Sequence, residues 1–307
     1  MKQLIKNSCK FLFPLLLLFG VSEMASSWWY GKYLGLPGQY QVFKSKRKQV
    51  ETLFIGDSHI NCCTDTSQIP NSYVLWWGAR DLYSINKLVE QNIPEMPRLK
   101  NIVMNLSYFS FANINSIQDP QTINDYFHLG ICPDTDYDHR YLSTLYAQHQ
   151  ILYKTLRQVL QRKTGIPYNE EVAVGMKPIA QLNSPEEFRA HAEAKLTEHG
   201  KPIAYATKHP DCVAKNNTYL QHVIELCDKN KLNLKIIIPP LSSFYLDKFT
   251  YKTTFYQQLN QFKVEHPGVL IYDYSSAFPD SISYFRDSDH LNSIGAKKFT
   301  HTIRQLL

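Results

Sequence analysis

The sequence lacks the patterns that mark several specialised classes of protein. It has no internal repeat and no low-complexity tract, which excludes solenoid and collagen-like architectures. Its six cysteines form no C-x-x-C pair and show no zinc-finger spacing, so we expect no structural zinc site. No RNA- or DNA-binding motif is present, and the net charge of +6 over 307 residues is modest. Nucleic acid is therefore not an expected partner.

The composition is that of a folded globular protein. Apolar residues make up 44% of the chain and charged residues 20%, values that argue against extended disorder. A chain of this length can bury a substantial core, as one large domain or two small ones. Five cysteines remain after Cys9, which lies in the N-terminal segment. One or two disulfides are possible in an exported protein, and free buried cysteines are the alternative.

The first residues have the pattern of a targeting segment. Three lysines precede an apolar run from Phe11 to Val21, which is the order of a secretory signal. The run is shorter than the ~20 residues of a spanning helix, but the aromatic residues 28–30 could extend it to the far interface. A small-residue cleavage site is poorly formed around Ala25. We expect residues 1–30 to be an uncleaved signal anchor with the domain outside; a cleaved signal or a buried N-terminal helix are the alternatives.

Residues 31–50 contain glycine, proline and a basic cluster, and they show no strong period. We expect them to form a juxtamembrane connector. Basic residues placed here favour an anionic membrane surface over a nucleic-acid groove. The cluster consists of Lys44, Lys46, Arg47 and Lys48.

The remainder of the chain, residues 51–307, alternates apolar runs with amphipathic segments. Strand, helix, strand in this rhythm predicts a parallel sheet covered on both faces. The predicted fold is a three-layer α/β/α domain with a five-stranded, mostly parallel sheet. Between about residues 110 and 216 the rhythm stops and a helical insertion is expected, with one helix along 142–159 and another that begins at Ser184 and stops at Gly200. The five strands are expected near 52–55, 72–78, 101–106, 232–238 and 269–273.

The first predicted strand leads directly to a serine. Gly56 and Asp57 break the apolar run, and Ser58 follows at once. Open α/β sheets place reactive groups at the carboxyl ends of their strands. Ser58 is therefore a candidate nucleophile, and a helix cap at the end of a strand is the alternative.

A second polar group follows the last predicted strand. Asp287 precedes His290 by three residues in a loop, so its carboxylate can hydrogen-bond the imidazole and stabilise the cation that forms when His290 takes a proton. Alone, this spacing is also typical of a solvated loop or a helix cap. Loops at the carboxyl edge of one sheet can meet, so Ser58 and His290 together predict a serine–histidine pair.

With these two blocks the chain resembles the SGNH hydrolases, also called GDSL-like esterases, whose fold is flavodoxin-like. Gly56-Asp57-Ser58 matches the family's first block, with Ser58 as nucleophile, and Asp287 with His290 matches its last. The family's second block implies an oxyanion-hole glycine after the second strand, for which Gly78 fits. Its third block implies an oxyanion-hole asparagine, for which Asn105 is the candidate. The last block extends through Leu291, Asn292 and Gly295.

The third block departs from the family's G-x-N-D, because Val103 and Leu106 stand where the glycine and aspartate belong. Asn105 could therefore be an ordinary strand-end residue. The N-terminal segment and the two end blocks look most like the branch that handles acyl groups on cell-envelope polymers. That resemblance implies a membrane-anchored, extracytoplasmic (periplasmic or cell-surface) esterase or O-acyltransferase. Its substrate would be an acyl-bearing glycan or small ester, it would use no cofactor, and envelope acyl-transfer proteins would be possible partners.

The alternative from another class is a catalytically silent SGNH-like scaffold or glycan-binding component of an envelope assembly. Two neighbours of the candidate triad are expected to stay outside it. Asp289 has the wrong spacing, and His59 follows Ser58 directly, so its side chain is expected to point away as a pocket-edge or structural residue. Asp57, His59, Asp287, Asp289 and His290 together could be imagined as metal ligands, but a serine–histidine pair explains the same residues without a metal.

Overall fold

The computed structural model describes residues 2–33, 35–78, 80–114, 120–131, 181–278 and 282–307. The chain divides into two compact units. One consists of Met1–Val42 with Ser116–Pro178, and the other of Phe43–Asn115 with Ile179–Leu307. The predicted helix along 142–159, with His149 on its apolar stripe, lies outside the described residues.

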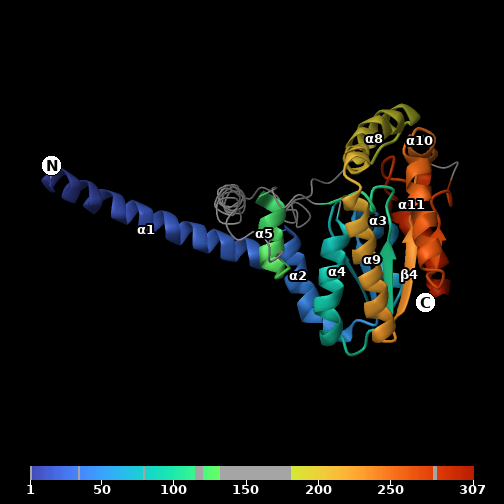
Figure 1. The fold of residues 1–307 in the computed structure, drawn as a ribbon, viewed down its shortest axis with the longest axis horizontal. Helices are drawn as coiled ribbons and strands as arrows, with labels where there is room; N and C mark the ends of the chain where they lie inside the picture. Colours follow the sequence, from blue (N-terminus) through green and yellow to red (C-terminus); the bar gives the residue numbers. More distant parts are fainter. Residues whose placement is uncertain (1, 34, 79, 115–119, 132–180, 279–281) are drawn as a thin grey trace. The chain divides into compact units, whose positions relative to one another are not determined.

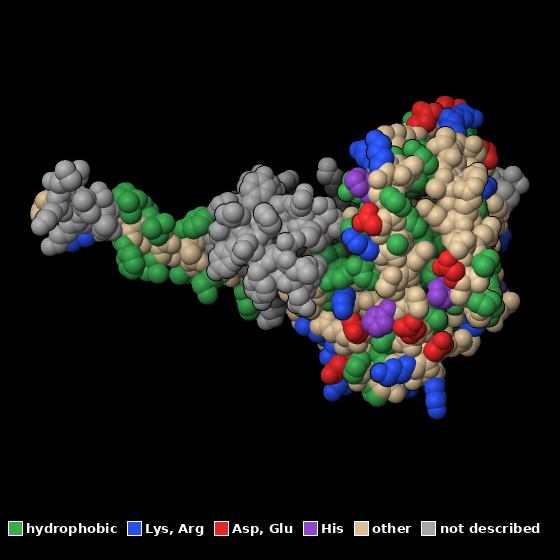
Figure 2. Space-filling model, viewed as in Figure 1, with side chains coloured by type: hydrophobic (Ala, Val, Ile, Leu, Met, Phe, Trp, Pro, Cys, Tyr) green, Lys and Arg blue, Asp and Glu red, His purple; other side chains and the backbone are tan. Residues whose placement is uncertain are grey.

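The first unit contains α1 (Lys2–Tyr33) and α5 (Pro120–Leu129), and α2 (Gly35–Lys46) begins in it. Apolar side chains of α1 between Phe11 and Phe19 are exposed (Figure 2). None of the helices in the described ranges combines the length with the apolar character that a membrane span requires. Much of the range predicted as a connector is helical, because α2 is followed directly by a 3-10 turn, Arg47–Gln49.

The second unit is built on the predicted five-stranded sheet, and all of its strand pairs are parallel. The order β2-β1-β3-β4-β5 is that of a flavodoxin-like doubly wound sheet. This confirms the predicted three-layer α/β/α fold. The strands are β1 (Thr52–Gly56), β2 (Ser72–Trp76), β3 (Asn101–Asn105), β4 (Asn233–Ile238) and β5 (Ile271–Asp273).

Helices cover both faces of this sheet (Figure 1). From β1 the chain crosses to β2 in one direction, and every later crossover runs in the opposite direction. Because crossovers are right-handed, α3 lies on the face opposite the later crossover helices. α4 packs against α9, and α12 packs against α3. The helices of this unit are α3 (Ser58–Cys63), α4 (Leu82–Asn92), α8 (Pro185–Lys208), α9 (Asp211–Lys229), α10 (Ser243–Leu246), α11 (Lys252–Glu265) and α12 (Ser293–Ile303), with 3-10 turns at Thr66–Gln68, Ile93–Glu95, Ile282–Tyr284 and Arg304–Leu306.

The change of direction between β1 and β3 has a functional consequence. β1 and β3 are adjacent, but the chain leaves them toward opposite edges of the sheet. In open α/β sheets a crevice forms at this point, beyond the carboxyl ends of the strands. Asp57 and Ser58 follow β1 there, and Asn105 is the last residue of β3.

The helix that begins at Ser184 differs from its prediction at one end. Its start has the predicted capping box, in which the Ser184 hydroxyl accepts from the Glu187 amide and the Glu187 carboxylate accepts from the Ser184 amide. Gly200, however, does not stop it, and α8 continues to Lys208. A Cβ at Gly200 would lie 3.0 Å from the Tyr251 ring. Close packing against that ring accounts for this glycine, so the predicted helix stop was wrong.

Candidate active site

The polypeptide turns sharply between β1 and α3, and this turn presents Ser58. Asp57 is the N-cap of α3, and its carboxylate accepts from the His59 amide at 2.9 Å. Ser58 is the first residue of the helix and is half-buried. The helix-cap alternative therefore applies to Asp57, and the Ser58 hydroxyl is left to interact elsewhere.

That hydroxyl meets the loop before α12. Ser58 Oγ lies 2.8 Å from His290 Nε2, although 232 residues separate the two in the sequence. On the other side of the ring, His290 Nδ1 lies 2.9 Å from Asp287 Oδ1 and 3.1 Å from Oδ2. Asp287 and His290 are buried. The structure thus brings together Ser58, His290 and Asp287 in one hydrogen-bonded chain.

The loop that carries Asp287 and His290 is held by its own backbone. Asp287 Oδ1 accepts from the amides of Asp289 and His290 at 3.1 and 2.9 Å, which fixes the loop around the carboxylate. Asn292 then caps α12 by accepting from the Ile294 and Gly295 amides.

Gly295 is required by a close approach, because a Cβ there would lie 2.2 Å from the Tyr284 carbonyl oxygen. The Leu-Asn-x-x-Gly sequence therefore shapes the loop. Within the described part of the chain, its side chains make no hydrogen bond to the Ser58 hydroxyl.

Asn105 lies at the end of β3 and is 2% exposed. Its Oδ1 accepts from the Asp57 amide at 3.1 Å, and its Nδ2 donates to Asp57 Oδ1 at 2.8 Å and to Ser107 Oγ at 3.1 Å. Both amide hydrogens of Asn105 are thus engaged. It can donate to a substrate oxygen only by giving up one of these bonds.

Gly56 explains why Asn105 fits so closely. A Cβ at Gly56 would lie 1.7 Å from Asn105 Oδ1. Only glycine leaves room for the amide that ties the end of β3 to the end of β1.

Gly78 lies just beyond β2, beside the end of β1. Trp76 is the ladder partner of Gly56, and the Trp77 amide donates to the Gly56 carbonyl at 3.3 Å. Gly78 is exposed and has open space around its Cα. The register therefore places it near the level of Ser58 at the same edge of the sheet, and its predicted oxyanion role stays a prediction.

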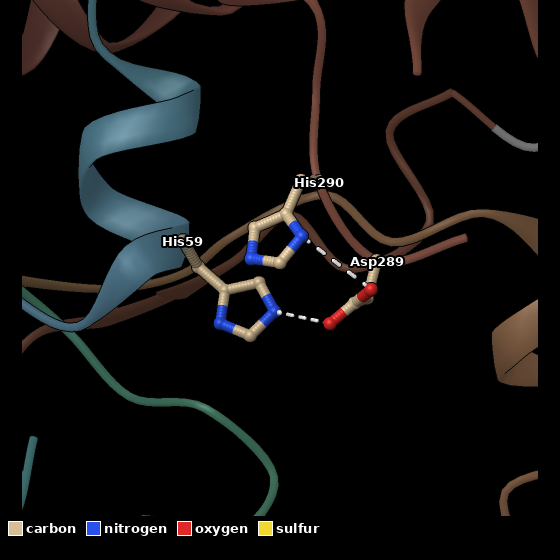
Figure 3. Close-up of side chains that lie close together, drawn as sticks. All are labelled: His59, Asp289 and His290. Carbon is tan, nitrogen blue, oxygen red and sulfur yellow. Dashed lines mark ion pairs between the residues drawn. The ribbon is translucent and has the colours of Figure 1, made fainter. Parts of the chain in front are cut away.

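His59 does not point away, so that expectation was wrong. Its ring is buried and stacks on His290, with the centroids 4.8 Å apart and an interplanar angle of 17° (Figure 3). His59 Nδ1 lies 3.1 Å from Asp57 Oδ1 and 2.9 Å from Ser107 Oγ, and its Nε2 lies 3.5 Å from Asp289 Oδ2. Because Ser58 is the first residue of a helix, the next side chain turns inward below the triad rather than outward.

Charge and burial together set the pKa values of Asp57 and His59. Burial by itself would raise the pKa of Asp57, but the charge of His59 and hydrogen bonds from His59 and Ser107 outweigh it and lower the pKa to about 2. Burial would lower the pKa of His59, yet Asp57 and Asp289 raise it to about 10. The two groups therefore form a buried ion pair at neutral pH.

The same balance applies to the histidine beside Ser58. Burial opposes the protonated form of His290, but the charge of Asp289 and the hydrogen bond to Asp287 raise its pKa above the ordinary value. Burial would raise the pKa of Asp289, but His290 and His59 hold it well below its usual range. Asp287 and Asp289 thus both stabilise the imidazolium that His290 would become on taking the proton of Ser58.

Two groups of donors lie close enough together to be considered for a metal ion: His59, Asp289 and His290, and His191, Asp287 and Asp289. Several of these atoms are already engaged in hydrogen bonds. His290 Nδ1 and Asp287 Oδ1 bond each other at 2.9 Å, and His191 Nδ1 lies 2.8 Å from Ser288 Oγ. We assign none of them as a metal ligand.

Sequence patterns missed several residues around the site. Ser107, two residues after the end of β3, links Asp57, Asn105 and His59. His191 and His199 on α8 reach the site from the predicted insertion. The sequence feature that could have indicated them is the spacing of eight residues between two histidines on one predicted helix.

The cysteines described beyond α1 are Cys62, Cys63, Cys212 and Cys227, and all four are free thiols. Cys62 lines an open groove beside the loop before α12, together with Arg286, Leu291 and Lys297. Cys63 is buried, and its thiol faces the Ile60 carbonyl. Of the two neighbouring cysteines, Cys62 alone lines this groove.

Comparisons with known proteins add a weak likeness of fold. No protein family matches the chain, and no curated protein matches it. Among solved structures, it is similar to a chain from Bacteroides fragilis NCTC 9343 that is provisionally described as an acylhydrolase. The TM-score is 0.42 at 10% sequence identity, over 87% of this chain and 93% of that chain. At this level of likeness we draw nothing about activity from it.

Proposed function

We propose that this protein is a serine esterase or O-acyltransferase of the SGNH type. One observation carries the proposal, which is the hydrogen-bonded chain from Ser58 Oγ through the His290 ring to Asp287. A serine hydroxyl is a weak nucleophile at neutral pH and needs a general base within hydrogen-bond reach. His290 meets that requirement, and Asp287 orients it.

The chemistry follows from this geometry. As Ser58 Oγ bonds to the carbonyl carbon of an ester, its proton passes to His290 Nε2 and the carbonyl oxygen becomes an oxyanion. Collapse of this intermediate breaks the bond to the alcohol, which leaves with the proton from His290, so that an acyl-serine remains. A water molecule or a sugar hydroxyl then gives a proton to His290 and attacks the acyl carbon. Collapse of this second intermediate breaks the acyl–Oγ bond, and Ser58 takes back the proton from His290. Water completes an esterase cycle, and a sugar hydroxyl completes an acyl transfer.

The oxyanion is proposed to lie against backbone amides. The Ser58 amide is at the first turn of α3, where N–H groups have no partner within the helix. The Gly78 amide follows β2 at the same edge of the sheet. Asn105 would be a third donor, after exchanging one of its present hydrogen bonds for the substrate. Loss of one such donor typically costs about 3–4 kcal/mol of barrier.

We further propose that the substrate is an ester of a cell-envelope glycan or a related polymer, and that the protein acts outside the cytoplasm. The open groove beside Leu291 contains two cationic side chains, Arg286 and Lys297, and amides suited to polar substrates. In the N-terminal segment, lysines precede the apolar run from Phe11 to Val21, as in an export signal. Envelope acyl-transfer proteins would supply or receive the acyl group.

The catalytic proposal is tested by labelling with a fluorophosphonate and by hydrolysis of p-nitrophenyl acetate. Wild type should label at Ser58 and hydrolyse the ester, whereas Ser58→Ala should do neither. Ser276→Ala, at an exposed serine outside the hydrogen-bonded chain of Ser58, His290 and Asp287, is the matched control and should behave as wild type. If folded wild-type protein neither labels nor hydrolyses the ester, the catalytic proposal is wrong and a silent scaffold is the better account.

Cell fractionation tests the location. The full-length chain should be found with the envelope, exposed to protease added outside the inner membrane. Deletion of residues 2–33, the whole of α1, should leave the protein in the cytosol. Recovery of the full-length protein in the cytosolic fraction would contradict export.

A further inference from the structure

Asp289 has no role in the proposed reaction, yet four histidines surround its carboxylate. Four imidazole nitrogens approach its two carboxylate oxygens. On one oxygen they are His290 Nδ1 at 3.4 Å and His191 Nδ1 at 3.9 Å; on the other they are His59 Nε2 at 3.5 Å and His199 Nε2 at 3.9 Å. These come from α3, α8 and the loop before α12. Three separate parts of the chain therefore converge on a single carboxylate.

This carboxylate is buried without a conventional partner. Asp289 is 1% exposed, and neither of its side-chain oxygens makes a hydrogen bond in the part of the chain that is described. A buried carboxylate left in this state is costly unless a cation compensates it. The groups close enough to compensate it most directly are the surrounding imidazoles.

The hydrogen bonds of His59 identify it as that cation. The hydroxyl hydrogen of Ser107 is donated to Asp57 Oδ2, so the nearby His59 Nδ1 must itself carry a proton. His59 Nε2 faces Asp289 Oδ2, and a bare lone pair there would repel the carboxylate. Both ring nitrogens are thus protonated, which agrees with the raised pKa of His59.

The His59 ring also supports His290 mechanically. It stacks beneath His290 at 4.8 Å, and it is itself held at Nδ1 by Asp57 and Ser107. A cation in this position disfavours a second positive charge on His290, whereas Asp289 favours it. The two groups act on His290 in opposite directions.

We propose that Asp289 and His59 are positioning residues, a buried counter-ion pair that holds the His290 ring in place and sets how readily it accepts the proton of Ser58. This inference rests on the proposed function in that His290 is the general base. The side chains of the pair act through His290 and make no hydrogen bond to the Ser58 hydroxyl, whose described partner is His290 Nε2. Asp289 is thus a second carboxylate beside His290, in addition to its hydrogen-bonded partner Asp287.

Several other titratable or charged groups face Asp289 and His290. Their charges must be the same in wild type and variants if the effect of the pair on His290 is to be isolated. His199 is held neutral because burial lowers its pKa to about 4. The groups are Asp57 after β1, Cys62 on α3, His191, Lys195, Glu198 and His199 on α8, Tyr245 on α10, and Arg286 and Asp287 in the loop before α12.

The test is an NMR titration of the His290 ring in the full-length protein, which needs no turnover. The His290 signal is identified by its loss in His290→Gln. Asp289→Asn should lower the pKa of His290 by about one pH unit or more, and His59→Gln should raise it, because one variant removes an anion and the other a cation. Asp228→Asn, at an exposed position on α9, is the matched carboxylate control and should leave the pKa unchanged.

The pH dependence of p-nitrophenyl acetate hydrolysis supplies the second measurement. The acid limb of kcat/KM should move to lower pH in Asp289→Asn and to higher pH in His59→Gln, and Asp289→Glu should restore most of the wild-type profile. A merely structural role would lower activity without moving the limb.

If the pKa of His290 is the same in Asp289→Asn as in wild type, the inference is wrong. That outcome can be read even if His59→Gln fails to fold. If the titration shifts as expected while no variant or wild type hydrolyses ester, the pair is upheld and the proposed reaction fails.

Discussion

Replacement of Gly56 by alanine tests whether the link between β1 and β3 holds the Ser58 turn. The new Cβ would lie 1.7 Å from Asn105 Oδ1 and 2.9 Å from its Cγ. Side-chain carbons never approach so closely, so the Asn105 amide must leave its position. Because Asn105 is 2% exposed, it cannot turn into solvent and regain its hydrogen bonds there.

The cost can be worked from the bonds that Asn105 makes. Displacement breaks its bond from the Asp57 amide, worth about 1 kcal/mol, and its charge-assisted bond to the Asp57 carboxylate, worth about 1.5–3 kcal/mol. It also removes a donor from Ser107. We expect Gly56→Ala to lower the free energy of unfolding by about 3–5 kcal/mol, a large share of the about 5–15 kcal/mol of a typical domain.

Urea unfolding followed by circular dichroism measures this cost. Gly268→Ala is the matched control, because a Cβ there meets nothing within 4 Å, and it should change stability by less than about 0.5 kcal/mol. In an Asn105→Ala background the clash is gone, so adding Gly56→Ala should cost much less than in wild type. If Gly56→Ala is as stable as Gly268→Ala, the close approach of Asn105 to β1 does not exist in solution and the reasoning fails.

Three further predictions concern the site and its supports. Asp287→Asn should reduce kcat for p-nitrophenyl acetate by about 10⁴-fold, through loss of the correct tautomer of His290; a loss below tenfold would contradict the orienting role. Gly295→Ala should weaken fluorophosphonate labelling of Ser58, because its Cβ would meet the Tyr284 carbonyl at 2.2 Å, and wild-type labelling would contradict this. The pKa of His59, about 10 when folded, lies above its unfolded value of about 6.5, so its stabilisation is complete below that value and is lost as the pH rises through about 10. Urea unfolding from pH 7 to 10 should therefore show falling stability, and a smaller fall in His59→Gln; equal slopes would refute it.

The strands were predictable because each contains a short apolar run. β1 is buried along its whole length and β4 at its carboxyl end, as both faces of a parallel sheet demand. The Ser184 helix start was predictable for a similar local reason, since a capping box is complete within four residues. Gly200 was not, because its role is set by the Tyr251 ring more than forty residues away in the sequence.

The residues of the site also differ in whether the sequence alone could predict them. Ser58 stands out in the sequence because it directly follows a predicted strand, and Asp287 and His290 stand out because they are three residues apart in the loop after the last strand. The partners that hold them do not stand out. Asn105 was noticed, but the commitment of its amide to Asp57 and Ser107 depends on how β1 and β3 lie together.

Sequence alone determined the sheet, the helices that cover it and the candidate residues at its carboxyl edge, because those follow from local hydrophobic period and turn chemistry. Tertiary structure alone decided what those residues touch. It turned His59 inward beneath His290, and it brought α8 close enough for His191 and His199 to reach Asp289. The physical reason is that burial and charge pairing join residues that no sequence spacing relates, so the electrostatics of the site exist only once the chain has folded.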